Sequence, residues 1–223
     1  MDSEFAEMSG EMMEFGLAAL SHANRHAAYS CLENPRWPQL SVVEAAHAAE
    51  LLIKARIAQE HPLLLFEQLP KAPKDGDSAL RLDDLFSNGR TIQWMDLPDR
   101  LWAVTGISLT NRRLFLEFGR IRNGFQHFLP GGQTDSSDAT LRFVFEVIDP
   151  FINRCWGLFA IDYDEDCEPY VYLVGALARR EIPFLVSIEA AACFQYWDVD
   201  WNGVSTKYRE LMHARVLEAT VRS

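Results

Sequence analysis

Arg122, Asn123 and His127 are the residues of this chain whose types and spacing are best suited to chemistry. They lie close together near the middle of the sequence, inside a segment with helical periodicity. An imidazole titrates near neutral pH and can therefore accept or donate a proton during a reaction. A guanidinium stays charged and binds phosphate oxygens through its planar fork. An arginine and a histidine that converge on one phosphate could thus catalyse phosphodiester cleavage without a metal ion.

The apolar pattern around these residues predicts a helix over about residues 109–128. At about 100° per residue, five side chains form one stripe that should face a core: Leu114, Phe118, Ile121, Phe125 and Phe128. The opposite face carries Arg113, Leu116, Arg120, Asn123 and His127. A histidine on this outward face is either exposed to solvent or part of an interface between subunits.

Two neighbours of His127 favour the interface. Leu116 places an apolar side chain on the outward face. Gly124 destabilises the helix by about 1 kcal/mol relative to alanine, and its presence is explained if another backbone or a ligand lies close to it. The alternative is that the arginines form a solvated face and that Gly124 has no special role. Arg122 and His127 are separated by about 140° around the helix, whereas Asn123 and His127 share one side. Either Arg122 bends toward the histidine, or a two-fold-related copy completes the set.

Composition and charge limit the partners and the cellular compartment that we expect for this protein. The net charge of −11 argues against tight, non-specific coating of nucleic acid, which is usually the work of basic proteins. The stretch from Arg112 to Arg122 is locally basic and fits a transient contact with nucleic acid or an acidic partner. No apolar run reaches about 18 residues, and the first residues do not resemble a signal peptide. Four scattered cysteines fit a reducing compartment, so a cytoplasmic protein is expected.

Helical periodicity dominates the rest of the chain as well. The expected helices cover about residues 10–30, 41–59, 138–156, 168–182 and 205–221. The second should begin at a capping box formed by Ser41 and Glu44, and the one after residue 138 should begin at Asp138 and bend at Pro150. These elements predict an all-α fold, an antiparallel helical bundle of four or five long helices with irregular insertions.

The predicted bundle covers residues 1–160 and contains a long insertion at about 69–108. That insertion is rich in proline, glycine and aspartate, and we expect short helices in it near 79–86 and 99–104. Residues 161–223 are expected to form a helical extension packed on the same domain. The aromatic residues within 192–201 are expected to complete its core rather than to stack on nucleobases.

Other polar residues offer weaker candidates. Glu50 and Lys54 are spaced for an ion pair on the second helix, which is either structural or supports the active cleft. His22 and His26 are also four residues apart, but their context is that of an ordinary polar face. The acidic residues that begin at Asp162 lack the spacing of a calcium loop, so a solvated loop is expected. We therefore expect neither a metal site nor a cofactor.

Together, these features resemble the HEPN superfamily. Its ribonuclease members carry an Arg-Asn-x-x-x-His motif, which the residues from Arg122 to His127 match. The alanine-rich segment 45–55, with Glu50 and Lys54, is similar to the second helix of many members. The resemblance covers roughly residues 10–160.

This resemblance implies a metal-independent endoribonuclease that cleaves single-stranded RNA by attack of the 2′-hydroxyl and works as a homodimer with a composite active site. By this analogy His127 is the general acid or base, Arg122 stabilises the scissile phosphate, and Asn123 orients the substrate or the histidine. Arg113 and Arg120 are expected to contact the RNA. Such members often act as toxins restrained by an antitoxin, or in defence against phage. Since some members are not catalytic, the alternative is a helical module that binds RNA, a nucleotide or a protein partner.

Overall fold

The structure, a computed structural model, describes residues 3–29, 31–71, 80–127, 135–165 and 170–221, without the side chains of residues 3–6, Phe86 and His127. This part of the chain is mostly helical and contains one small sheet of two short strands, so the predicted all-α fold is confirmed. Among the helices described, none combines the length and the apolar character needed to cross a membrane.

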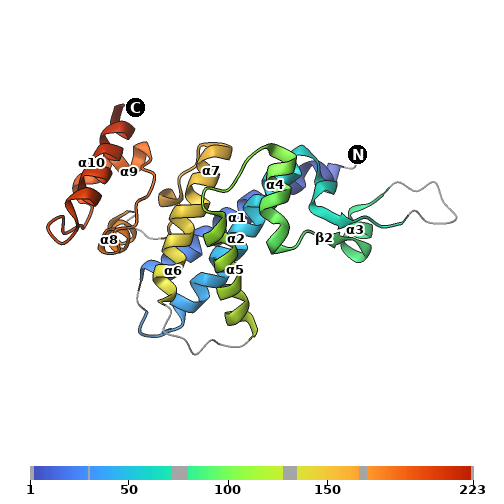
Figure 1. Ribbon diagram of the computed structural model, residues 1–223, viewed down its shortest axis with the longest axis horizontal. Coiled ribbons are helices and arrows are strands. Elements are labelled where there is room, and N and C mark those ends of the chain that lie inside the picture. The colour runs from blue at the N-terminus through green and yellow to red at the C-terminus, as the bar shows by residue number, and fades with distance from the viewer. Residues whose placement is uncertain (1–2, 30, 72–79, 128–134, 166–169, 222–223) are drawn as a thin grey trace. The chain divides into compact units, whose positions relative to one another are not determined.

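Long helices account for most of the described chain. They are α1 (Ser3–Ala28), α2 (Trp37–Glu60), α5 (Arg112–His127), α10 (Thr206–Val221), and the pair α6 (Ser136–Phe143) and α7 (Asp149–Trp156). The last two are joined by one π-helical segment, η3 (Val144–Ile148). Helices α1 and α2 pack antiparallel, as expected for the predicted bundle. Figure 1 labels these helices and colours them from blue at the N-terminus to red at the C-terminus.

The chain divides into two compact units whose limits fall inside α1 and α2. The first comprises Met1–Gly16 and Glu50–Ser108, and the second comprises Leu17–Ala49 and Leu109–Ser223. Residues on both sides of position 160 thus belong to the second unit. The extent of the predicted bundle, residues 1–160, stays a prediction.

The first unit contains the predicted insertion. Its smaller elements are η1 (Pro62–Leu65), β1 (Phe66–Gln68), α3 (Leu82–Asn88), β2 (Arg90–Thr91), η2 (Trp94–Asp96) and α4 (Leu97–Thr105). Strands β1 and β2 pair antiparallel and were not predicted, because two or three residues are too few to show alternation. Gly16 of α1 lies so close to α2 that a Cβ there would come within 2.8 Å of Leu52 Cγ.

The second unit is held by buried polar contacts as well as by its apolar core. The Asn24 side chain, which is fully buried, donates to the carbonyl oxygens of Ala160 (3.0 Å) and Tyr163 (2.7 Å). Ser41 Oγ and Thr140 Oγ1 are 2.9 Å apart and join α2 to α6. The remaining elements of this unit are η4 (Ala160–Asp162), α8 (Val171–Arg179), α9 (Ile188–Ala192) and η5 (Phe194–Tyr196).

Two predicted helix starts were wrong. Helix α2 begins at Trp37, so Ser41 lies inside the helix, where its hydroxyl donates to the Pro38 carbonyl instead of capping the end. Helix α6 begins after Asp135, whose side chain accepts the Asp138 N–H at 3.1 Å. In both cases a competing polar residue or proline upstream allows the helix to start earlier than the chosen cap.

A π-helical segment lies directly before Pro150, where the sequence predicted a bend. Proline has no N–H, so Pro150 cannot donate to the carbonyl one turn earlier. The N–H of Asp149 instead donates to the Val144 carbonyl, five residues back. This wider turn places Asp149 and Pro150 at the start of α7.

Candidate functional site

Helix α5 positions the residues from Arg122 to His127. It begins at Arg112, and the Asn111 side chain caps it by accepting the Leu114 N–H at 3.1 Å. Phe115 and Phe118 are fully buried, and the Phe118 ring stacks on Phe143 of α6 with centroids 3.8 Å apart. These contacts fix the first half of α5 against α6.

The core-facing side of α5 differs from the predicted stripe. Phe118 is buried as expected, but Leu114, Ile121 and Phe125 are only half-buried, and Phe128 lies outside the described residues. Phe115, which the stripe omitted, is fully buried. The buried face is therefore rotated by roughly 70° around the helix, toward the side on which the Phe143 ring lies against Phe115 and Phe118.

This rotation changes the surroundings of Arg122. It lies seven residues after Phe115, which is about 20° away around the helix, so it continues the core-facing side toward the helix end. Its side chain is half-buried, and its Nη1 donates to Gln126 Oε1 at 3.0 Å. Asn123 is exposed. His127 is the last residue of α5, and its side chain is not among those that the structure describes, so its predicted role stays a prediction.

The other two arginines predicted to contact RNA lie on the exposed side of α5, as expected. Arg113 Nε donates to Glu117 Oε1 at 2.7 Å, and this hydrogen bond and the carboxylate charge raise the pKa of Arg113 above its ordinary value. Arg120 is exposed. Arg113 would have to exchange Glu117 for a phosphate in order to bind RNA.

Glu50 and Lys54 form the predicted ion pair within the first unit. Lys54 Nζ lies 2.7 Å from Glu50 Oε1, and the Lys54 side chain is 11% exposed against 27% for Glu50. Residues on nearly every side of this part of α2 are buried, as the sequence predicted. A role for the pair in supporting the active cleft stays a prediction.

The two N-terminal histidines are each paired with a separate carboxylate. His26 Nδ1 lies 2.7 Å from Glu44 Oε2, and His22 Nε2 lies 2.9 Å from Glu165 Oε1. In the ranges that the structure describes, no group of three or more His, Cys, Asp or Glu side chains could hold a metal ion. Asp162 of the acidic loop accepts hydrogen bonds from Tyr170 and Ser187 rather than being simply solvated.

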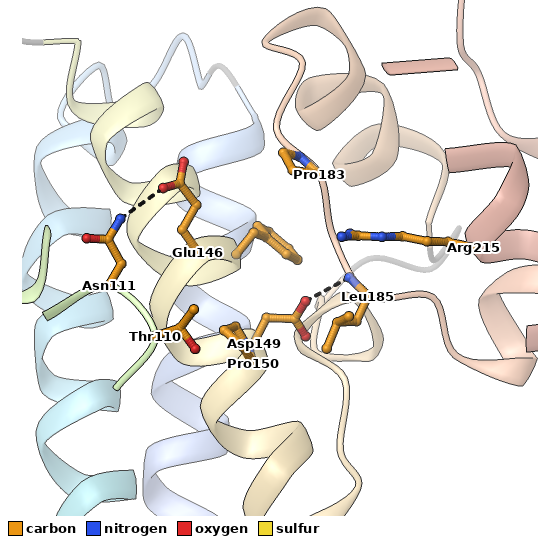
Figure 2. A pocket seen from close by; sticks show the side chains of 9 residues that line it. Thr110, Asn111, Glu146, Asp149, Pro150, Pro183, Leu185 and Arg215 are labelled. Carbon is orange, nitrogen blue, oxygen red and sulfur yellow. Dashed lines mark hydrogen bonds between the residues drawn. The ribbon is translucent and has the colours of Figure 1, made fainter. Parts of the chain in front are cut away.

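A pocket in the second unit was not predicted from the sequence. It has a volume of about 420 Å³, and Figure 2 shows Arg215 and the pair Asn111 and Glu146 entering it from opposite sides. Its lining consists of Thr110, Asn111, Phe145, Glu146, Asp149, Pro150, Pro183, Leu185 and Arg215.

Asp149 forms the buried base of this pocket. Its side chain is fully buried, and its two oxygens accept the N–H groups of Ala160 and Leu185, each at 2.8 Å. Burial raises the pKa of Asp149 to about 7, although the two N–H donors and the charge of Arg215 oppose this shift. The carboxylate therefore joins the chain leaving α7 to the segment before α9 and titrates near neutral pH.

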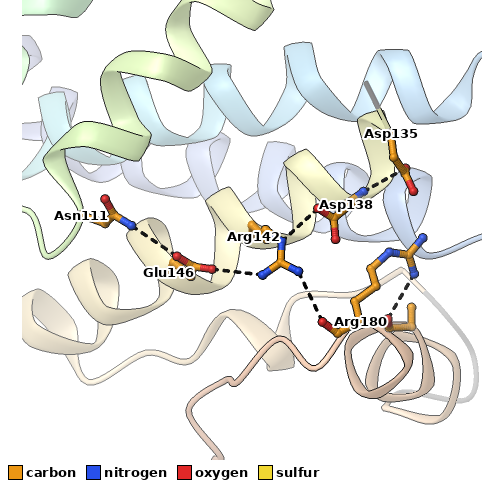
Figure 3. Close-up of polar contacts among 7 residues, drawn as sticks. Asn111, Asp135, Asp138, Arg142, Glu146 and Arg180 are labelled. Atoms are coloured by element: carbon orange, nitrogen blue, oxygen red, sulfur yellow. Dashed lines mark hydrogen bonds and ion pairs between the residues drawn. The ribbon is translucent and has the colours of Figure 1, made fainter. Parts of the chain in front are cut away.

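Glu146 belongs to a polar network on the adjoining surface (Figure 3). Its Oε2 accepts from Asn111 Nδ2 at 3.3 Å, and its Oε1 lies 3.6 Å from Arg142 Nη1. Arg142 also donates from Nε to Asp138 at 2.9 Å and from Nη2 to the Arg180 carbonyl at 3.4 Å. These contacts hold the Glu146 carboxylate at the mouth of the pocket.

The sequence contains one signal that could have indicated this pocket. Asp149 lies with Glu146 in the mostly apolar stretch 143–152, and a carboxylate buried there needs specific hydrogen-bond donors. Nothing in the sequence links it to Leu185 or Arg215, which come from distant segments.

No protein-family model, curated protein sequence or solved structure matches this chain. Its function must therefore be argued from its own residues.

Proposed function

We propose that this protein is a metal-independent endoribonuclease of the HEPN type, which cleaves single-stranded RNA. The observation that carries the proposal is the placement of Arg122, Asn123 and His127 in the last two turns of one helix, α5. Packing of Phe118 on Phe143 gives this helix a rigid base. The half-buried position of Arg122 supports the proposal, because a guanidinium partly shielded from water binds phosphate more strongly than an exposed one.

The proposed chemistry uses the RNA itself as the nucleophile. His127 accepts the proton of the 2′-hydroxyl, whose oxygen attacks the adjacent phosphorus. The bond from phosphorus to the 5′-oxygen breaks, and that oxygen takes a proton from water. The products are a 2′,3′-cyclic phosphate and a free 5′-hydroxyl. Arg122 stabilises the negative charge that develops on the phosphate oxygens. Asn123 orients the substrate or the imidazole.

The active site is composite in this proposal. Positions 122 and 127 are separated by about 140° around α5, so one copy of the helix does not direct both residues to one point. A two-fold axis between two chains brings Arg122 of one copy to His127 of the other. Exposed Arg113 and Arg120 then extend the contact along the RNA backbone.

A toxin–antitoxin or anti-phage role in the cytoplasm fits this activity. A ribonuclease without sequence restriction harms its host unless another protein restrains it, so we propose an antitoxin or a regulatory partner. The net charge of −11 supports transient binding of RNA rather than tight, long-lived binding.

A second candidate is a non-catalytic helical module that binds RNA, a nucleotide or a protein partner. It is favoured by the side-chain contacts of the arginines, since Arg113 is bonded to Glu117 and Arg122 to Gln126. These bonds stabilise the helix and leave each guanidinium fewer N–H donors for a phosphate.

Cleavage of single-stranded RNA in EDTA distinguishes the two candidates. We expect cleavage by the wild type and a loss of about a hundredfold or more in Arg122→Ala and in His127→Ala, the size typical of removing acid–base or phosphate-binding groups. Arg154→Ala and His213→Ala change exposed residues of the same types and should cleave normally. Intact RNA with the wild type, or equal cleavage by all variants, would reject the ribonuclease.

Mixing the two inactive variants tests the composite site. A dimer of one Arg122→Ala chain and one His127→Ala chain keeps one complete site, so an equal mixture should recover about a quarter of wild-type activity. If heterodimers form but cleavage activity is not recovered, Arg122 and His127 of each active site must come from the same chain.

A further inference from the structure

The pocket around Asp149 and Arg215 has no part in the proposed ribonuclease chemistry. All of its lining residues belong to the second unit, and none is among the residues proposed for RNA cleavage. Its volume of about 420 Å³ falls in the range of sites that bind small molecules.

Arg215 supplies the positive group of the pocket. It extends from α10 and donates from Nη1 to the Phe184 carbonyl, and this bond fixes the direction of the guanidinium (Figure 2). A guanidinium has five N–H donors, and no other residue in the described ranges bonds to Arg215. The donors that remain can hold a carboxylate through two parallel hydrogen bonds.

Glu146 supplies the negative group from the opposite side. Its contacts with Asn111 at 3.3 Å and Arg142 at 3.6 Å are long, and a carboxylate has about four lone-pair positions. Glu146 is half-buried, so a ligand can still reach its carboxylate, which has the capacity to accept further N–H groups. The hydroxyl of Thr110, which is exposed, adds a further donor and acceptor on this side.

Asp149 does not compete with Glu146 for the N–H groups of a ligand. Both of its oxygens already accept backbone N–H groups at 2.8 Å. The remaining walls are apolar and come from Phe145, Pro150, Pro183 and Leu185. The pocket therefore offers one cation, one accessible anion and an apolar surface between them.

This pattern selects against ligands with a single charge. An anion alone would be attracted by Arg215 but repelled by Glu146, whose nearest cation, Arg142 Nη1, lies 3.6 Å away on the outer side of the pocket. A cation alone would be attracted by Glu146 but repelled by Arg215. We propose that the pocket binds a small zwitterion, with a carboxylate on Arg215, an ammonium on Glu146 and a short apolar body between them.

Matched ligands test this directly. ε-Aminocaproate, caproate and hexylamine share one carbon chain and differ only in their charged ends, and free leucine adds a shorter zwitterion. Calorimetry and thermal unfolding should detect binding of at least one zwitterion, about tenfold or more tighter than that of caproate and hexylamine. Absence of zwitterion binding, or equal binding of all ligands, would overturn the proposal.

Variants of the pocket add a second criterion. Glu146→Gln keeps the side-chain shape and removes the negative charge, so caproate should then bind as tightly as ε-aminocaproate. Thr110→Val should weaken zwitterion binding less, and Glu189→Gln, an exposed change outside the pocket, should have no effect. A Glu146→Gln variant that still prefers the zwitterion would contradict the assignment. RNA cleavage should be unchanged in all three, so the two proposals can fail separately.

Discussion

Replacement of Asp149 by asparagine should remove a specific pH dependence of the free energy of unfolding. The wild-type carboxyl is buried with a pKa of about 7, well above its ordinary value of 3.8. Because the shift is upward, the folded state binds the proton more tightly than the unfolded state does. The contribution of Asp149 to stability is therefore complete below about pH 4 and is lost as the pH rises through 7.

The size of this effect follows from the shift. Each unit of difference in pKa between folded and unfolded states corresponds to about 1.4 kcal/mol, so the whole shift amounts to roughly 4 kcal/mol. Between pH 5 and pH 8 the wild type should lose about 3 kcal/mol relative to Asp149→Asn. The asparagine keeps one acceptor oxygen but directs an NH₂ group at one of the N–H groups of Ala160 or Leu185. That mismatch adds a constant cost of about 1–3 kcal/mol at every pH.

Urea unfolding of both proteins at several pH values between 5 and 8 measures this difference. Asp135→Asn provides a control, since it makes the same substitution at an exposed helix cap, and its pH profile should follow that of the wild type. Parallel profiles for the wild type and Asp149→Asn would show that Asp149 does not titrate in this interval. A wild type that gains stability relative to the variant as the pH rises would refute the direction of the shift.

Three further predictions concern the elements that support the proposed sites, each checked by urea unfolding at constant pH. Phe118→Ala removes a fully buried ring from its stack and should destabilise by about 3–5 kcal/mol, whereas an effect below 1 kcal/mol would mean that this stack does not anchor α5. Lys54→Met breaks a half-buried ion pair and should destabilise by about 1–2 kcal/mol, more than Arg56→Met, whose partner is more exposed; the opposite order would contradict the burial argument. Ser41→Ala should cost about 1–2 kcal/mol by leaving the buried Thr140 hydroxyl without its partner, and adding Thr140→Val should recover most of the loss unless the bond contributes little.

The fold class was predictable because helical periodicity extends over long segments of this chain. Apolar residues recur every three or four positions through α1, α2, α5 and α10. Helices α5 and α10 lie close to their predicted limits, whereas α1 begins seven residues and α2 four residues before the predicted start. The starts of α2 and α6 were less predictable, because each helix begins a few residues before the chosen cap. Helix α2 begins at Trp37 rather than at Ser41, and α6 is capped by Asp135 rather than by Asp138.

The exposed side of α5 was predicted better than its buried side. Arg113, Arg120 and Asn123 are exposed as expected. The buried side was misplaced because periodicity identifies a broad apolar face, and only the partner helix selects its centre. Here the Phe143 ring selects Phe115 and Phe118, a choice that no pattern within α5 contains.

The pocket could not be predicted because its parts are distant in the sequence. Asp149 bonds to the backbone of Ala160 and Leu185, and Arg215 is added from the last helix. Backbone N–H groups have no sequence signature, and a lone arginine on a helix is usually a surface residue. The part of this arrangement that the sequence displays is the presence of two acids, Glu146 and Asp149, in a mostly apolar stretch.

The most direct test of the proposed function is whether cleavage requires the 2′-hydroxyl of the substrate. A single-stranded RNA and its fully 2′-O-methylated counterpart should be incubated with the protein in EDTA, and the products analysed by mass spectrometry. We predict that the RNA yields fragments ending in a 2′,3′-cyclic phosphate and that the methylated strand stays intact. Uncut RNA, or equal cleavage of both strands, would contradict the proposal that Arg122 and His127 promote attack by the 2′-oxygen.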